Sequence, residues 1–202
     1  MPSRASGAIF RTTLHLLQLA LICLLPACQA AYTYHGSPYT PPQAAPALSL
    51  RTTTGELFSL ADHAGQPVLI FFGYTHCPDV CPATTAEVHQ VFDQLGERAD
   101  RVTFAFITVD PERDTADALR AFLDRFDPRF VGLTGDDEAL AAARQAYGVF
   151  AERDAEGSAD YTMTHTSRLF LIDPSGRLVT NYTFDEPSEV LLADLRHLLE
   201  PG

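Results

Sequence analysis

One stretch of the sequence, residues 68–82, restricts the possible folds more than any other. It begins with an unbroken apolar run at residues 68–72, stops at Gly73, and continues as a polar turn that holds two cysteines. A continuous apolar run of this length is typical of a strand buried on both faces, as in the parallel sheets of α/β proteins. Apolar residues at helical spacing follow from Ala83. The stretch therefore predicts a central strand that leads through a cysteine-containing turn into a helix.

The two thiols of this turn, Cys77 and Cys81, lie where the helix dipole and free backbone N–H groups stabilise a thiolate. Thiolates at close spacing suit either disulfide exchange or the capture of a soft metal ion such as Cu(I). Residues four apart share one face of a helix, so both sulfurs can reach one ion. A disulfide across the same spacing is also allowed. The spacing alone leaves both chemistries open.

The rest of the chain alternates between predicted strands and helices. A hairpin is predicted at residues 48–60, strands at 101–109 and 130–133, and helices at 83–95, 115–126 and 135–147. Residues 148–163 form a polar segment rich in acidic residues. A hairpin is predicted after it at residues 168–182, and a helix at 187–199. Strands separated by helices favour a parallel core, to which hairpins add antiparallel strands. We therefore predict an α/β, thioredoxin-like fold: a central mixed sheet flanked by helices, with an N-terminal hairpin.

The N-terminus carries the pattern of an export signal. Residues 9–25 are largely apolar, and the sequence Leu-Pro-Ala-Cys at residues 25–28 resembles a bacterial lipobox. We predict a lipoprotein-type signal peptide over residues 1–27 and lipidation of Cys28, with an uncleaved signal anchor as the alternative. Either version places the protein outside the cytoplasm, on the periplasmic side, and attaches it to the membrane.

Residues 28–47 contain four prolines and are predicted to form an extended tether. That leaves residues 48–202 as the folded, thioredoxin-like domain. The chain has 26 acidic residues, 14 arginines and no lysine, for a formal charge of −12. Such an acidic chain is a poor ligand for nucleic acid, and we expect no nucleic-acid partner.

A histidine far downstream completes the candidate site. In thioredoxin-like folds, the loop before the strand predicted at Arg168 packs against the cysteine turn, and thioredoxin-type oxidoreductases have a cis-proline there. Residues 161–167 contain no proline but contain His165. An imidazole beside two thiolates makes a trigonal site that suits Cu(I) and also accepts Cu(II). We therefore predict copper as the cofactor, with Cys77, Cys81 and His165 as the metal ligands.

Two further residues are predicted to lie beside the ligands rather than among them. His76 adjoins Cys77, and a solvated side chain fits it better than direct ligation. Asp79 either caps the helix or adjusts the electrostatics of the site. The acidic segment 110–114 is expected to form a local turn network at the end of a strand.

Four motifs in order carry a family resemblance: GYTHCPDVCP at residues 73–82, VDPERDT at 109–115, GLTG at 132–135, and His165-Thr166 followed by LIDPSG at 171–176. The chain resembles the SCO/SenC family of cytochrome c oxidase assembly proteins. The resemblance implies a thioredoxin-like copper protein that helps to load the Cu(A) centre of oxidase subunit II, with Cys77, Cys81 and His165 as ligands. Many family members have an acid before the histidine, where this chain has Thr164.

A metallochaperone is therefore expected rather than an enzyme. Its expected partners are cytochrome c oxidase subunit II, other copper chaperones, and a thioredoxin-like reductant that keeps the cysteines reduced. The alternative is a thiol–disulfide oxidoreductase that uses Cys77 and Cys81 as its redox pair to reduce an oxidase subunit or another exported protein. A third hypothesis is a peroxidase with one reactive cysteine near Thr75 and Arg168. This hypothesis leaves the second cysteine and His165 without a role.

Overall fold

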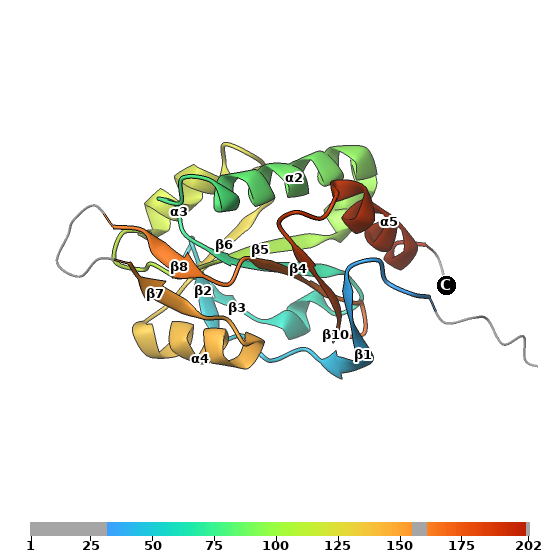
Figure 1. Cartoon of the computed structure of the whole chain (residues 1–202), viewed down its shortest axis with the longest axis horizontal. Helices are drawn as coiled ribbons and strands as arrows, with labels where there is room; N and C mark the ends of the chain where they lie inside the picture. The colour runs from blue at the N-terminus through green and yellow to red at the C-terminus, as the bar shows by residue number, and fades with distance from the viewer. Residues whose placement is uncertain (1–31, 155–160, 201–202) are drawn as a thin grey trace, which may run out of the picture. The chain divides into compact units, whose positions relative to one another are not determined.

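Strand β4 (Val68–Gly73) is a central strand of an eight-stranded sheet in the computed structural model, which describes residues 32–154 and 161–200. All six of its residues are buried, as the unbroken apolar run predicts. It pairs in parallel with β5 (Thr103–Thr108) and antiparallel with β9 (Arg168–Ile172). The strand order is β1-β10-β9-β4-β5-β6-β2-β3 (Figure 1).

The sheet is mixed, with a parallel centre and antiparallel edges. Strands β4, β5 and β6 (Val131–Thr134) are parallel, and helices connect them. β10 (Arg177–Thr183) pairs antiparallel with β9, while β2 (Leu50–Thr52) and β3 (Leu57–Phe58) form a hairpin against β6. The predicted thioredoxin-like fold and its N-terminal hairpin are confirmed.

Helices cover both faces of the sheet. Helices α2 (Val80–Leu95), α3 (Ala116–Leu123) and α5 (Ser188–Leu198) lie on one face, and α4 (Asp137–Tyr147) lies on the other (Figure 1). Thr115 caps α3 and Asp136 caps α4, because each side-chain oxygen accepts a backbone N–H of the first turn.

Aromatic rings join the sheet to these helices, and successive residues of β4 point to opposite faces. Phe71 packs against Phe106, which in turn packs against Phe122 of α3. Phe72 packs against Tyr147 of α4, with 5.7 Å between ring centroids. The strand that precedes the cysteines is thus held on both faces.

The structure differs from the sequence-based expectation near the N-terminus. Residues 37–44, predicted as part of a tether, form strand β1 (Ser37–Ala44), which pairs antiparallel with β10. Proline lacks the N–H that a ladder needs, and the register shifts between Pro38 and Gln43 around the two central prolines. An edge strand tolerates this, so the tether prediction is wrong at residues 37–44.

The predicted signal peptide and Cys28 lie outside the described residues. Within residues 32–154 and 161–200, no helix combines the length and the apolar character that crossing a membrane requires.

Helix α2 begins at Val80, three residues before the position that the apolar pattern indicates. Cys81 and Pro82 therefore lie in its first turn, where a proline costs no intrahelical hydrogen bond. Asp79 occupies the N-cap position but makes no side-chain capping bond. The first turn of α2 thus keeps backbone N–H groups directed at the preceding turn.

Candidate metal centre

The two cysteines lie on either side of the start of α2. Cys77 is partly buried in the turn after β4, whereas Cys81 is fully buried. Both are free thiols. The backbone N–H of Cys81 donates to the sulfur of Cys77 over 3.4 Å, and the N–H of Cys77 donates to the carbonyl of Tyr74. The turn therefore points the sulfur of Cys77 at the helix N-terminus.

Gly73 is required by the close approach of Cys81 to the end of β4. A Cβ atom at this position would lie 3.0 Å from the sulfur of Cys81, 2.7 Å from Phe106 and 2.8 Å from Phe71. The position demands glycine for space, and it lets the buried sulfur pack directly on the strand.

His165 reaches the cysteines from a separate two-stranded ribbon. Strand β7 (Ala151–Arg153) pairs antiparallel with β8 (Met163–His165), and His165 is the last residue of β8. This ribbon is not predicted by the sequence, in which residues 148–163 are simply a polar, acidic segment. Nε2 of His165 lies 3.5 Å from the sulfur of Cys81.

The ligand atoms of Cys77, Cys81 and His165 all lie within 4.8 Å of one another. With the bond lengths of zinc sites, about 2.3 Å to sulfur and 2.0 Å to nitrogen, three ligands in a trigonal plane lie about 3.7–4.0 Å apart. The observed group fits an ion after small movements of the side chains. Two sulfurs and one imidazole nitrogen form a donor set that favours soft ions such as Cu(I).

A second hydrogen bond orients the imidazole of His165. Its Nδ1–H donates to the carbonyl oxygen of Thr166 over 3.1 Å, because a carbonyl can only accept. The lone pair of the neutral ring is then on Nε2, which faces the sulfurs. Histidine ligands of metal ions are commonly held in this way.

The two thiols differ in their acidity. The hydrogen bond from the Cys81 thiol outweighs the opposing effect of burial and, together with the backbone N–H groups of Cys81 and Asp79, lowers the pKa of Cys77 to about 3. The same hydrogen bond to Cys77, together with burial, raises the pKa of Cys81. At neutral pH, the metal-free pair consists of one thiolate and one thiol.

The sequence matches the model of the SCO1/SenC family over residues 38–200. The chain belongs to this family. Among known relatives, the human "Protein SCO1 homolog, mitochondrial" is 35% identical over 156 residues, which cover 76% of this chain and 52% of the human protein. This chain thus spans about half the length of that relative.

Two solved SCO structures support the assignment. ScoI of Bradyrhizobium japonicum, solved with copper bound, is 39% identical, with a TM-score of 0.70 over 76% of this chain and 98% of that one. Apo Sco1 of Thermus thermophilus is 33% identical, with a TM-score of 0.75 over 84% of this chain and 99% of that one. The family resemblance predicted from the four motifs is confirmed.

In this SCO1/SenC protein, a buried cluster attaches the ribbon of His165 to the main sheet. Nε of Arg113 and the hydroxyl of Tyr161 both donate to Asp110, each over 2.6 Å. The guanidinium of Arg113 also donates to the carbonyl of Tyr161 and lies 3.5 Å from the centre of its ring. The segment 110–114 is therefore more than the local turn network that the sequence predicts.

Tyr74 provides a second attachment between β4 and the ribbon. Its hydroxyl accepts the backbone N–H of Met163 over 3.2 Å, and its ring meets the ring of His165 edge-on. Tyr74 is buried, and it directly follows the glycine that contacts Cys81. No pattern in the sequence indicates this role of Tyr74.

A buried carboxylate fixes the turn that carries Cys77. Asp114 accepts the backbone N–H of Thr75 at 3.1 Å, the hydroxyl of Thr75 at 2.6 Å and that of Thr108 at 2.7 Å. Its side chain is fully buried, and burial raises its pKa. These bonds hold the backbone two residues before the first cysteine.

The other two candidate site residues lie outside the ligand group of the described structure. The side chain of His76 is 51% exposed, and its Nδ1 faces Thr75 and, 3.8 Å away, Asp114. Asp79 is exposed, and its contribution to the site is the backbone N–H directed at Cys77.

Proposed function

We propose that this protein binds one copper ion through Cys77, Cys81 and His165 and delivers it to the Cu(A) centre of cytochrome c oxidase subunit II. The observation that carries the proposal is the convergence of two sulfurs and Nε2 of His165 within 4.8 Å. The copper-bound structure of the 39% identical ScoI supports copper as the ion. We also propose that other copper chaperones supply the metal.

The geometry suits transfer as well as binding. Cys81 is fully buried, whereas Cys77 and His165 are partly exposed. A partner's ligands therefore replace Cys77 and His165 first, and Cys81 last. A disulfide between the cysteines removes two of the three ligands. A thioredoxin-like reductant therefore keeps the protein able to bind copper.

We propose an extracytoplasmic location on the periplasmic side, with attachment to the membrane through lipidated Cys28. The lipobox-like sequence at residues 25–28 supports this location. Free thiols in such an oxidising compartment would need a dedicated reductant.

Replacement of His165 by alanine is expected to weaken Cu(I) binding by about 100-fold or more, because the loss of a direct ligand exceeds the 10–100-fold effect of a residue that only orients one. The measurement is a competition titration of the reduced protein with a chromophoric Cu(I) chelator. His76→Ala is the matched control, since His76 lies outside the ligand group, and it should leave the affinity unchanged. Sub-stoichiometric binding by the wild type, or equal effects of the two variants, would contradict the proposal.

A second candidate function, thiol–disulfide exchange, is favoured by the unequal acidity of the two cysteines. A partly exposed thiolate beside a buried thiol is the arrangement of an attacking and a resolving cysteine. The exchange needs only Cys77 and Cys81, so His165→Ala should retain it. Both functions can use the same turn.

The rate of Cys77 alkylation by iodoacetamide is expected to stay nearly constant between pH 5 and 8. A pKa of about 3 leaves Cys77 as thiolate throughout this range, whereas the rate at an unperturbed thiol rises about tenfold per pH unit. Mass spectrometry of the reduced, metal-free protein measures the modification, and Cys77→Ser identifies the site. An alkylation rate that rises tenfold per pH unit would show that Cys77 is not a thiolate in this pH range.

A further inference from the structure

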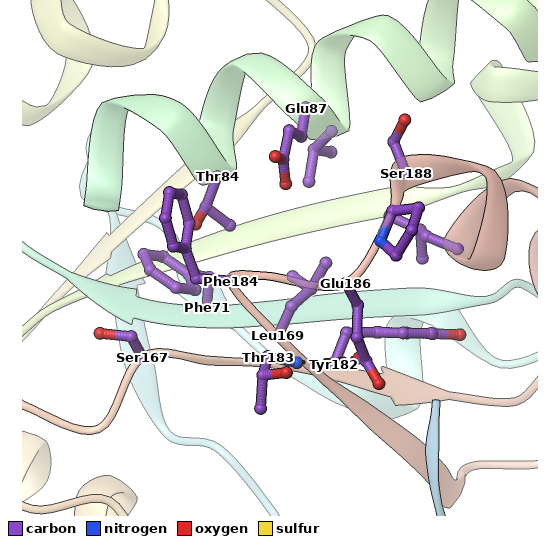
Figure 2. A pocket seen from close by; sticks show the side chains of 13 residues that line it. Phe71, Thr84, Glu87, Ser167, Leu169, Tyr182, Thr183, Phe184, Glu186 and Ser188 are labelled. Atoms are coloured by element: carbon purple, nitrogen blue, oxygen red, sulfur yellow. Dashed lines mark hydrogen bonds between the residues drawn. The ribbon is translucent and has the colours of Figure 1, made fainter. Parts of the chain in front are cut away.

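A small pocket next to the metal centre has no part in the function described so far. It lies between α2 and the connection from β10 to α5, and Phe71, Thr84, Glu87, Leu169, Phe184 and Leu191 are among the residues that line it (Figure 2). We call it the α2–α5 pocket. Its volume is about 20 Å³, which is room for about one water molecule. It can enclose the end of one side chain, or of a small cation of the same shape, but not a larger metabolite.

Two polar groups on α2 face this pocket without partners. Thr84 is 6% exposed, and its hydroxyl oxygen is buried without a hydrogen bond to any described residue. Glu87, three residues later on the same helix face, is half-buried and makes no hydrogen bond or ion pair within the described part of the chain. A buried hydroxyl normally has a partner, so the hydroxyl of Thr84 indicates a ligand that supplies one, with the carboxylate of Glu87 as a neighbouring acceptor.

The charge of the pocket selects a cationic ligand. Its lining includes two carboxylates, Glu87 and Glu186, and no arginine or histidine. Glu186 already accepts the backbone N–H of Thr183, which leaves Glu87 as the open acceptor. Burial raises the pKa of Glu87 because it disfavours the charged carboxylate. A cation beside Glu87 would stabilise the carboxylate and so oppose this shift.

The remaining walls suit a side chain with an apolar stem. Phe71, Leu169 and Leu191 form apolar lining, and the ring of Phe184, 38% exposed, lies beside Thr84 (Figure 2). Lysine and arginine bury their methylene stems along apolar surfaces and place their charged heads against carboxylates or aromatic faces.

The pocket shares a wall with the metal centre. Phe71 lines the pocket, and its ring also meets the ring of His165 edge-on, with 6.3 Å between centroids. Ser167, two residues after His165, is a further lining residue. The ring of Phe71 therefore lies between a group held in the pocket and His165 of the metal centre.

We propose that the α2–α5 pocket receives a lysine or arginine side chain of a partner polypeptide and so positions that partner at the Cys77–Cys81–His165 centre. The reason for a partner to approach this centre rests on the proposed function, whereas the occupancy of the pocket does not. The cationic head lies between Glu87 and the hydroxyl of Thr84, and the stem lies on Phe184 and the apolar wall.

The test uses n-propylguanidinium and n-butylammonium, which reproduce the ends of arginine and lysine, with n-pentanol as the uncharged probe. Each is titrated into the reduced, metal-free protein and followed by amide NMR shifts. Saturable shifts are expected at residues 83–91, 167–169 and 183–191 for the cations, and none of comparable size for n-pentanol.

Variants identify the groups responsible. Glu87→Gln should weaken the binding of n-propylguanidinium by about fivefold, the upper value for a partly exposed ion pair. Thr84→Val should weaken it by about threefold while keeping the side-chain shape. Glu97→Gln, an equal loss of charge at an exposed site on another element, is the matched control and should change nothing.

The proposal would be overturned by the absence of saturable shifts at the pocket, by an equal response to n-pentanol, or by equal affinities in Glu87→Gln and Glu97→Gln. Shifts of the same residues that depend on protein concentration without any probe would instead identify a second copy of the chain as the occupant, and would also overturn it. A Cu(I) titration of Glu87→Gln, expected to match the wild type, separates this result from a failure of the copper proposal itself.

Discussion

Replacement of Asp114 by alanine is expected to lower the free energy of unfolding by about 3 kcal/mol. The buried carboxylate accepts the N–H of Thr75 and the hydroxyls of Thr75 and Thr108. The hydroxyls can turn to other acceptors, but the backbone N–H of Thr75 cannot, and a buried unsatisfied donor costs about 1–3 kcal/mol. A cavity at the same place adds to the loss. Because Thr75 precedes Cys77 by two residues, copper affinity should fall as well.

Urea denaturation with linear extrapolation measures this effect. Asp114→Asn keeps the volume and one acceptor oxygen, so it should retain part of the lost stability. Asp124→Ala is a suitable control, because Asp124 is exposed and, among the described side chains, its carboxylate pairs only with Arg120, a contact worth less than about 1 kcal/mol. If Asp114→Ala were no more destabilising than this control, the carboxylate would not hold the turn.

Replacement of Cys81 by serine is expected to reduce Cu(I) affinity by well over 100-fold, a larger loss than removing a group that only orients a ligand. A serine hydroxyl stays protonated at neutral pH and is a hard donor, whereas Cu(I) prefers thiolates. The loss of Cu(I) affinity should exceed the loss caused by a substitution at the protein surface. Cys81 is fully buried, and no other described side chain can take its place as a ligand.

The same chelator competition measures the loss, with Ala83→Ser as the control. That variant adds a hydroxyl to the same turn of α2 without touching a ligand. Cys77→Ser should behave like Cys81→Ser. Retention of affinity within tenfold by Cys81→Ser would remove the buried cysteine from the ligand set and, with it, the proposed three-coordinate site.

The sequence identified the residues that converge at the centre but not those that hold them. Cys77 and Cys81 are four residues apart, so their proximity follows from local geometry. His165 was placed through the fold class alone. The bonds of Asp114 to Thr75 and of Tyr161 to Asp110 span 39 and 51 residues, and no periodic pattern encodes such pairs. Tyr74, Arg113 and Tyr161 were missed for this reason.

The fold was predictable wherever burial imposed a pattern on the sequence. The apolar run at β4 reflects burial on both faces of the strand, and the helical spacing of apolar residues in α2 reflects burial of one helix face. Strand β1 has no such pattern, because it is an exposed edge strand interrupted by prolines. Leu57, an apolar residue of the predicted hairpin, is 63% exposed, since β3 lies at the other edge of the sheet and its neighbour Phe58 faces the core.

The contact between Cys81 and His165 joins residues 84 positions apart in the chain. During synthesis from the N-terminus, both cysteines emerge well before the histidine, and β9 and β10 follow it. A nascent or unfolded chain therefore presents two thiols that can oxidise before His165 lies beside them. If the protein binds copper as proposed, the three ligands come together only once the sheet is complete, so the thiols must stay reduced until then.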